Sequence, residues 1–159
     1  FTVLENVRLA AQSRRQQPWR IFSQAMKQQW SIDKAMACIA EAGLAGNEGR
    51  LAGVMSHGAQ RQLEIAMVLA TDAQVLLLDE PLAGMGSEES AKMVDVLKRL
   101  RETRAILLVE HDMDAVFAVA DTITVMVNGQ VLESGPPAQI RASIAVQEAY
   151  LGQEDSFHV

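Results

Sequence analysis

The sequence predicts an α/β fold in which a partial parallel sheet with flanking helices follows an N-terminal helical region. Two short apolar runs, Val75–Leu78 and Ala105–Val109, are typical of parallel strands covered on both faces. The segment between them, residues 87–101, carries apolar side chains at helical spacing. The order strand, helix, strand therefore indicates a parallel pair joined by a right-handed crossover.

Residues 1–70 are predicted to form a helical subdomain. Thr2 can cap a first helix, and two further helices are expected around Ile21–Trp30 and over Ile32–Glu41. Gly43 follows the third helix where a left-handed C-cap belongs.

Residues 71–159 are predicted to hold both apolar strands, a β-hairpin and the last helices. The hairpin is indicated by two apolar runs that flank Asn128-Gly129, a dipeptide suited to a tight primed turn. Gly135-Pro136-Pro137 is expected to break the chain before the last helices.

Composition excludes several classes of protein. The 159 residues suffice for one domain with a core, and the 49% hydrophobic content excludes general disorder. A net charge of -6 argues against a nucleic-acid partner, which would need clustered lysine and arginine. No apolar run is long enough to span a membrane. The single cysteine, Cys38, lies in an apolar run and is interpreted as a buried structural residue.

Two acids, Asp79 and Glu80, directly follow the first apolar strand. Ligands of open parallel sheets collect beyond the carboxyl ends of the strands. One carboxylate can hold Mg²⁺ and the other can take a proton from an attacking water. The competing interpretation is a strand that ends in solvated acids before a turn enforced by Pro81.

His111 follows the second apolar strand within Glu110-His111-Asp112, so we expect it at the same sheet edge as the two acids. There it could hydrogen-bond a terminal phosphate, whereas Asp112 is expected to cap the next helix. The competing interpretation is a histidine–aspartate metal site. Such a site would need more ligands, and His57 and His158 are the remaining histidines.

Ser56 is predicted to be the N-cap of an apolar helix, and Gly58 would let a ligand approach the backbone. Free N–H groups at a helix start attract anions. By itself this pattern favours an ordinary capped helix, and Ala59 stands where a capping box would place Glu or Gln.

Taken together and in this order, these motifs resemble the second half of an ATP-binding cassette (ABC) domain, and so a partial P-loop-NTPase-like sheet. MSHGAQ is similar to the family's signature loop, VLLLDEP to its magnesium-binding strand with the catalytic glutamate, and VEHDM to its switch-histidine loop. PLAGMGSEE is similar to the loop that joins the two halves of a dimer.

The resemblance implies ATP and Mg²⁺ as cofactors and assigns roles residue by residue. Asp79 would position Mg²⁺, Glu80 would be the general base, and His111 would contact the γ-phosphate. The remaining residues, implied to bind nucleotide or to form the dimer-crossing loop, are Ser56, Gly58, Gln60, Gly84 and Gly86.

The chain departs from the family's signature loop at two positions. His57 replaces a glycine, as in the variant of branched-chain amino acid importers, and Ala59 replaces glutamine or glutamate, with Gln60 following.

A phosphate-binding loop of the type GxxxxGK[ST] is missing from the sequence, because none of the ten glycines is followed by lysine. In the resembled family this loop lies upstream of a segment like the one that starts at Phe1, so we expect the chain to be part of a longer protein. The 159 residues alone are then expected to be inactive, and to expose an apolar edge that invites association.

The function implied is the ATP-binding and ATP-hydrolysing subunit of an ABC importer, with branched-chain amino acids as solutes. The expected partners are a second nucleotide-binding subunit, membrane permease subunits and, indirectly, a periplasmic binding protein; the expected location is the cytoplasmic face of the membrane. Three alternatives stay open at this point: a soluble ABC ATPase, a non-catalytic interaction module, and a histidine–aspartate phosphohydrolase.

Overall fold

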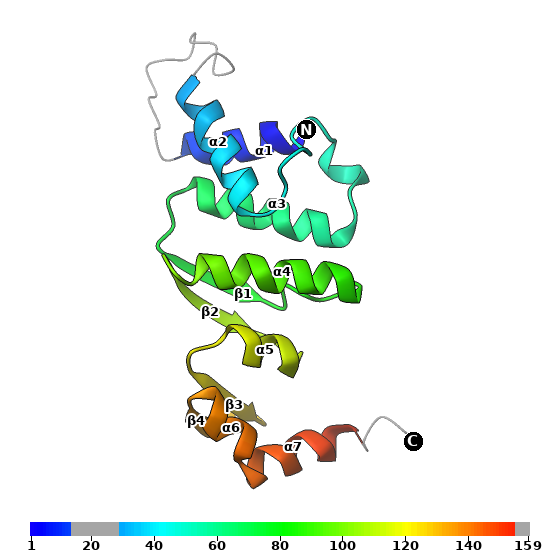
Figure 1. The fold of residues 1–159 in the computed structure, drawn as a ribbon, viewed down its shortest axis with the longest axis vertical. Helices are drawn as coiled ribbons and strands as arrows, with labels where there is room; N and C mark the ends of the chain where they lie inside the picture. Colours follow the sequence, from blue (N-terminus) through cyan, green and yellow to red (C-terminus); the bar gives the residue numbers. More distant parts are fainter. Residues whose placement is uncertain (14–28, 155–159) are drawn as a thin grey trace. The chain divides into compact units, whose positions relative to one another are not determined.

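The computed structural model describes residues 1–13 and 29–154 (Figure 1). Contacts divide the chain into two compact units, Phe1–His111 and Asp112–Val159. The helix expected around Ile21–Trp30 falls almost wholly outside the described residues. The division predicted at residue 70, into a helical subdomain and a part with the strands and last helices, stays a prediction.

Three of the described helices form the upper part of the first unit and pack on one another: α1 (Val3–Ser13), α2 (Gln29–Glu41) and α3 (His57–Ala70) (Figure 1). The cap predicted at Thr2 is confirmed. Its backbone N–H donates to Glu5 Oε2 at 2.7 Å, and the Glu5 N–H donates to Thr2 Oγ1 at 3.2 Å, so the pair forms a capping box.

Gly43 ends α2 in the left-handed conformation, with φ 80°. Its N–H donates to the carbonyl of Ala40, and the N–H of Leu44 donates to that of Ile39. These two bonds make a Schellman motif, which satisfies the last carbonyls of the helix. The predicted C-cap is therefore confirmed.

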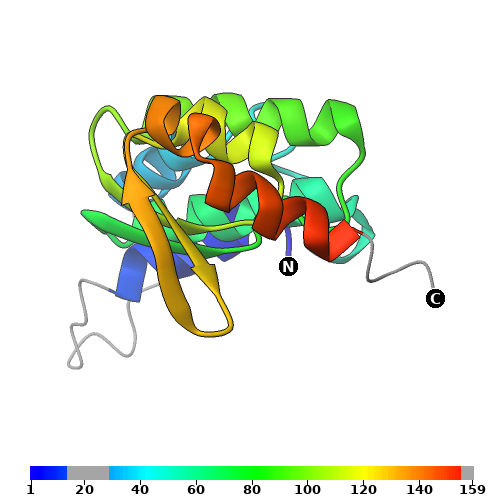
Figure 2. The same ribbon diagram turned by 90° about the horizontal axis from the view of Figure 1, so that it is seen from below.

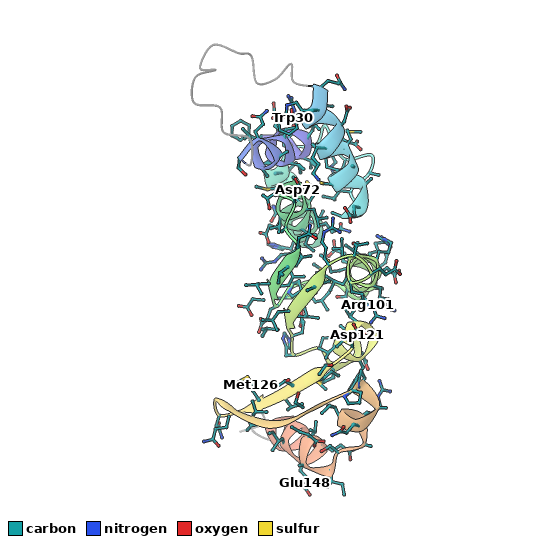
Figure 3. All side chains as sticks on the ribbon, turned by 90° about the vertical axis from the view of Figure 1, so that its left-hand side faces the viewer. Trp30, Asp72, Arg101, Asp121, Met126 and Glu148 are labelled. Carbon is teal, nitrogen blue, oxygen red and sulfur yellow. The ribbon has the colours of Figure 1, made fainter. Side chains whose placement is uncertain are left out.

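Two ion pairs hold α2 against the turns that enter the strands. Lys34 Nζ contacts the carboxylate of Asp72, which lies in the turn after α3 (Figure 3). The guanidinium of Arg104 donates to both oxygens of Glu41, at 2.5 and 3.4 Å. Both turns lie at the amino-terminal end of the strands, so they anchor the end opposite the predicted site.

The strands β1 (Val75–Asp79) and β2 (Ala105–Val109) pair in parallel, as predicted, with Val75 opposite Ala105 and Asp79 opposite Val109. The connecting helix is α4 (Ser87–Leu100), which lies alongside one face of the pair (Figures 1 and 3). Within α4 the buried stripe is Met93, Val96, Leu97 and Leu100.

The expectation that both faces of these strands are covered is wrong for this chain. Leu76 is buried at 1% exposure, but its neighbours on the other face, Val75 and Leu77, are 58% and 73% exposed. Leu107 and Val109 are exposed in the same way. Successive side chains of a strand point to opposite faces, so an apolar run stays half exposed when helices cover one face only.

The second unit contains a hairpin and three helices, with α5 (Met113–Val119), β3 (Ile123–Val127), β4 (Gln130–Gly135), α6 (Pro137–Ala142) and α7 (Ile144–Glu154). Figure 2 shows β3 and β4 as an antiparallel ribbon. Asn128 and Gly129 form its turn with φ values of 51° and 76°, as a primed turn requires. Ile123, Ile140 and Val146 make the core of this unit.

Asp112 caps α5 as predicted, because its Oδ1 accepts the N–H of Ala115 at 3.1 Å. Among the helices that the structure describes, none is both long and apolar enough to cross a membrane.

Candidate functional site

The parallel register brings the predicted acids and the histidine to one edge of the sheet. Asp79 lies opposite Val109, and the N–H of Glu80 donates to the Val109 carbonyl at 2.9 Å. Asp79 and Glu80 thus leave β1 at the level where Glu110 and His111 leave β2. The sequence prediction that Glu80 and His111 share this edge is confirmed.

Glu80 and His111 are close neighbours in solvent. The His111 Nδ1 lies 3.7 Å from Glu80 Oε1, and the two side chains are 73% and 55% exposed. This distance is longer than a hydrogen bond, so the carboxylate and the imidazole are not hydrogen-bonded to each other. Both side chains are accessible to a ligand.

Glu80 has a backbone conformation unusual for its type, with φ 45°. The N–H of Ala83 donates to its carbonyl at 3.1 Å, which closes a tight turn directly after β1. Non-glycine residues in the left-handed region cluster at functional sites, because the surrounding structure must hold them there.

Asp79 is exposed at the end of β1, beside Glu80. Magnesium prefers oxygen ligands, and in nucleotide enzymes one or two carboxylates bind it together with waters and substrate phosphates. Across residues 1–13 and 29–154 there is no cluster of three or more side chains that could form a metal cage. Asp79, as a single exposed carboxylate, fits an ion whose other ligands are waters and substrate phosphates.

The start of α3 forms a second candidate region. Ser56 is its N-cap, as predicted: its side chain is exposed, and its Oγ accepts the N–H of Ala59 at 3.4 Å. The predicted ligand Gln60 is engaged elsewhere, because its Nε2 donates to the Ala52 carbonyl at 3.2 Å. The helix start thus offers a hydroxyl and backbone N–H groups, and the role of Gln60 as a ligand stays a prediction.

Glu89 of α4 covers this helix start, a contact that residue type alone does not predict. The Ser56 hydroxyl donates to Glu89 Oε1 at 2.7 Å. A Cβ added to Gly58 would lie 2.9–3.1 Å from the Glu89 carboxyl group. Gly58 therefore lets a carboxylate sit against the first turn of α3.

The loop between β1 and α4 contains the two predicted glycines. Gly84 has φ 74°, a conformation that favours glycine, whereas Gly86 has φ -73° and is the N-cap of α4. No atom within 4 Å would meet a Cβ added at either position, so both glycines leave open space. Such a surface can admit the backbone of another molecule.

Glu110 is the member of this edge that sequence reasoning missed. Its side chain is 0% exposed. Its Oε1 accepts the N–H of Leu82 at 2.9 Å, and its Oε2 accepts the N–H of His111 at 3.1 Å. The only signal in the sequence was an acid directly before the histidine, and a solvated acid would look the same.

Comparison with known proteins decides the family. Residues 2–83, just over half of the chain, match the family described as ABC transporter. The chain belongs to this family. Residues 130–156 also match the family described as branched-chain amino acid ATP-binding cassette transporter. The resemblance inferred from the motifs is therefore confirmed.

Individual ABC proteins are similar over most of the chain. The high-affinity branched-chain amino acid transport ATP-binding protein LivG of Escherichia coli K12 is 35% identical over 96% of this chain and 63% of its own. BraF of Pseudomonas aeruginosa, of the same description, is 37% identical over 77% of this chain and 49% of its own.

A solved structure agrees with the fold. The ADP conformation of MJ1267, an ATP-binding cassette of an ABC transporter, superimposes with a TM-score of 0.76 and 26% identity, covering 95% of this chain and 63% of its own. The predicted α/β class is thereby confirmed. The chain spans less than two thirds of the length of LivG, BraF and MJ1267.

Proposed function

We propose that the full-length protein is the ATP-binding and ATP-hydrolysing subunit of an ABC importer. The observation that carries this proposal is the 3.7 Å approach of Glu80 and His111 beside Asp79, at the carboxyl end of a parallel pair. Family membership supports the same assignment.

In this proposal Asp79 would hold Mg²⁺, and the ion would supply charge neutralisation for the phosphates. Glu80 accepts a proton from the attacking water, as an exposed carboxylate beside the phosphates can. His111 donates a hydrogen bond to the γ-phosphate from the neighbouring strand. The 3.7 Å spacing leaves both groups free to contact one reacting centre.

The start of α3 is proposed to bind a phosphate. Ser56 and Gly58 are proposed to bind the γ-phosphate of the nucleotide held by a second nucleotide-binding subunit. A positively polarised helix start suits an anion once Glu89 has left Ser56, whereas the carboxylates of Asp79, Glu80 and Glu110 lie at the sheet edge. Gly84 and Gly86 are proposed to lie at the contact between the two subunits, where their open surroundings admit a partner backbone.

Branched-chain amino acids are the proposed solutes, from the match of residues 130–156 and from the names of LivG and BraF. The further partners proposed are membrane permease subunits and, through them, a periplasmic binding protein. The protein would then be cytoplasmic and peripheral at the inner face of the membrane. Uptake of labelled leucine by cells that lack the gene tests the solute.

The decisive experiment is steady-state ATP hydrolysis by the full-length protein and its Glu80→Gln variant. Loss of the proton acceptor is expected to lower kcat by about a hundredfold or more and to leave ATP binding in place. The exposed Glu102, at the other end of the strands, supplies the matched control, since Glu102→Gln makes the same chemical change.

Two results would contradict the proposal. One is full hydrolysis by Glu80→Gln; the other is a full-length protein that lacks a phosphate-binding loop and never hydrolyses ATP, which would favour an interaction module. The 159 residues alone are predicted to release no phosphate, since they contain no GK[ST] sequence to cradle a triphosphate.

A further inference from the structure

The buried carboxylate of Glu110 joins the two loops of the proposed site. One of its oxygens binds the N–H of Leu82, in the loop after β1, and the other binds the N–H of His111, after β2. Leu82 and Glu110 are 28 residues apart, so this contact exists only in the folded chain. Glu110 thereby fixes the distance between the histidine and the loop that carries Gly84 and Gly86.

The chemistry of this contact requires a carboxylate. An ionised carboxylate is purely an acceptor, and its two oxygens match two N–H donors. Glutamine of the same shape would offer one oxygen to one N–H and set its own NH₂ against the other. Asparagine or aspartate would be one methylene too short to reach both.

The burial of a charged side chain at this place costs more free energy than holding a loop closed requires. The Glu110 side chain is fully buried, and its Oε2 lies 3.7 Å from the same His111 Nδ1 that lies 3.7 Å from Glu80 Oε1. Burying a charge costs free energy unless hydrogen bonds compensate, and like charges nearby add to that cost. A neutral side chain could close a loop without it, which indicates a role beyond loop closure.

The second oxygen also faces the imidazole itself. Glu110 Oε2 lies 3.7 Å from His111 Nδ1, and Glu80 Oε1 lies at the same distance from that nitrogen. His111 is therefore held at its backbone by Glu110 and flanked at its ring by two carboxylates. Any displacement of the Leu82 loop moves the group that holds this histidine.

We propose that Glu110 is a positioning residue for hydrolysis, which couples His111 to the loop 81–86. In the proposed enzyme this loop meets the second subunit and His111 meets the γ-phosphate, so Glu110 transmits subunit closure to the phosphate. This inference rests on the proposed function. Glu110 itself touches neither nucleotide nor attacking water.

The test uses the full-length protein and its Glu110→Gln variant, with Glu102→Gln as the matched control. We expect kcat for ATP hydrolysis to fall about tenfold to a hundredfold, as misplacement of a catalytic group does. The KM for ATP is expected to change less than about twofold, since a loss confined to the transition state lowers kcat alone. Glu102→Gln should change neither constant.

Amide hydrogen exchange gives a readout independent of turnover. In Glu110→Gln, peptides that cover Leu82 and His111 are expected to exchange faster together, and peptides of α1 and α2 to stay unchanged. If the Glu110→Gln variant fails to fold, Glu110→Asp tests the coupling role, because aspartate keeps the charge but reaches only one of the two N–H groups. It should show the same loss of kcat.

The outcomes separate this inference from the proposed function. An unchanged kcat in Glu110→Gln and Glu110→Asp, with hydrolysis lost in Glu80→Gln, overturns the coupling role and leaves the ATPase intact. A fall in kcat that merely follows the folded fraction, or that comes with a matching rise in KM, also overturns it. Hydrolysis unaffected by Glu80→Gln overturns the proposed function instead.

Discussion

The sheet edge and the start of α3 differ in the charge that they present. The edge sets the carboxylates of Glu80 and Glu110 beside His111, with Asp79 at the same end of the two parallel strands. The helix start presents a serine hydroxyl and backbone N–H groups, set in place by a single cap. The edge suits a cation and a proton, and the helix start suits an anion.

This difference explains how one chain could contribute two unlike parts to the proposed nucleotide site. Carboxylates repel a triphosphate unless a cation lies between, whereas a helix start attracts it directly. In the present conformation Glu89 occupies the helix start through the Ser56 hydroxyl. A hydroxyl donates a single hydrogen bond, so Ser56 must leave Glu89 before it can donate to a phosphate.

The largest effect is expected from the two histidines, one in each region. His111→Ala in the full-length protein should lower kcat by about a hundredfold, as loss of a donor to a developing charge does. His57→Ala, at the start of α3, should lower it less than about tenfold, since backbone N–H groups there remain. Steady-state hydrolysis measures both, and equal losses would remove the distinction between the two regions.

A second prediction concerns association of the 159 residues alone. Four side chains on the uncovered strand face are more than half exposed, Val75, Leu77, Leu107 and Val109. Contiguous exposed apolar surface promotes association. We expect concentration-dependent oligomers in sedimentation velocity, and a shift toward monomer in the double variant Leu77→Lys, Leu107→Lys.

Matched lysines placed on exposed polar positions, Glu102→Lys and Glu88→Lys, should leave the oligomers in place. A monomer at every concentration before any substitution would show that this strand face does not self-associate.

A third prediction tests the contact between Gly58 and Glu89. An alanine at position 58 would push its Cβ into the Glu89 carboxyl group. Gly58→Ala should therefore lower the thermal midpoint by a few degrees, which corresponds to about 1 kcal/mol. In the Glu89→Ala background the same change should be neutral or stabilising, because alanine favours helix over glycine.

The double-mutant cycle on these two residues isolates their interaction. Additive shifts in the thermal midpoint would mean that Glu89 does not sit against Gly58 in solution.

The smallest effect is expected at Cys38, far from both regions. Its side chain is 3% exposed, and burial raises the pKa of its thiol. The thiolate is the reactive form, so reaction with a maleimide at neutral pH should be slow in the folded chain and fast in urea. Equal reaction rates in both conditions would contradict the burial of Cys38. The Cys38→Ala variant gives the background signal of the assay.

Local chemistry made much of this fold predictable. Thr2, Gly43 and Asn128-Gly129 act on their own backbone within a few residues, so their effects follow from residue type. The strand limits and the shared edge of Glu80 and His111 follow in the same way, because parallel strands bring their carboxyl ends together. The order of motifs then identified the family.

What the sequence by itself determined is thus the class of fold, the parallel pair and the identity of the residues at its edge. Only the tertiary structure decided that Glu110 is buried across two loops, that Glu89 covers the start of α3, and that one strand face stays open. These contacts join residues 28 and 33 positions apart. Whether an acid is solvated or enclosed depends on which distant segments pack around it, and residue type does not encode that.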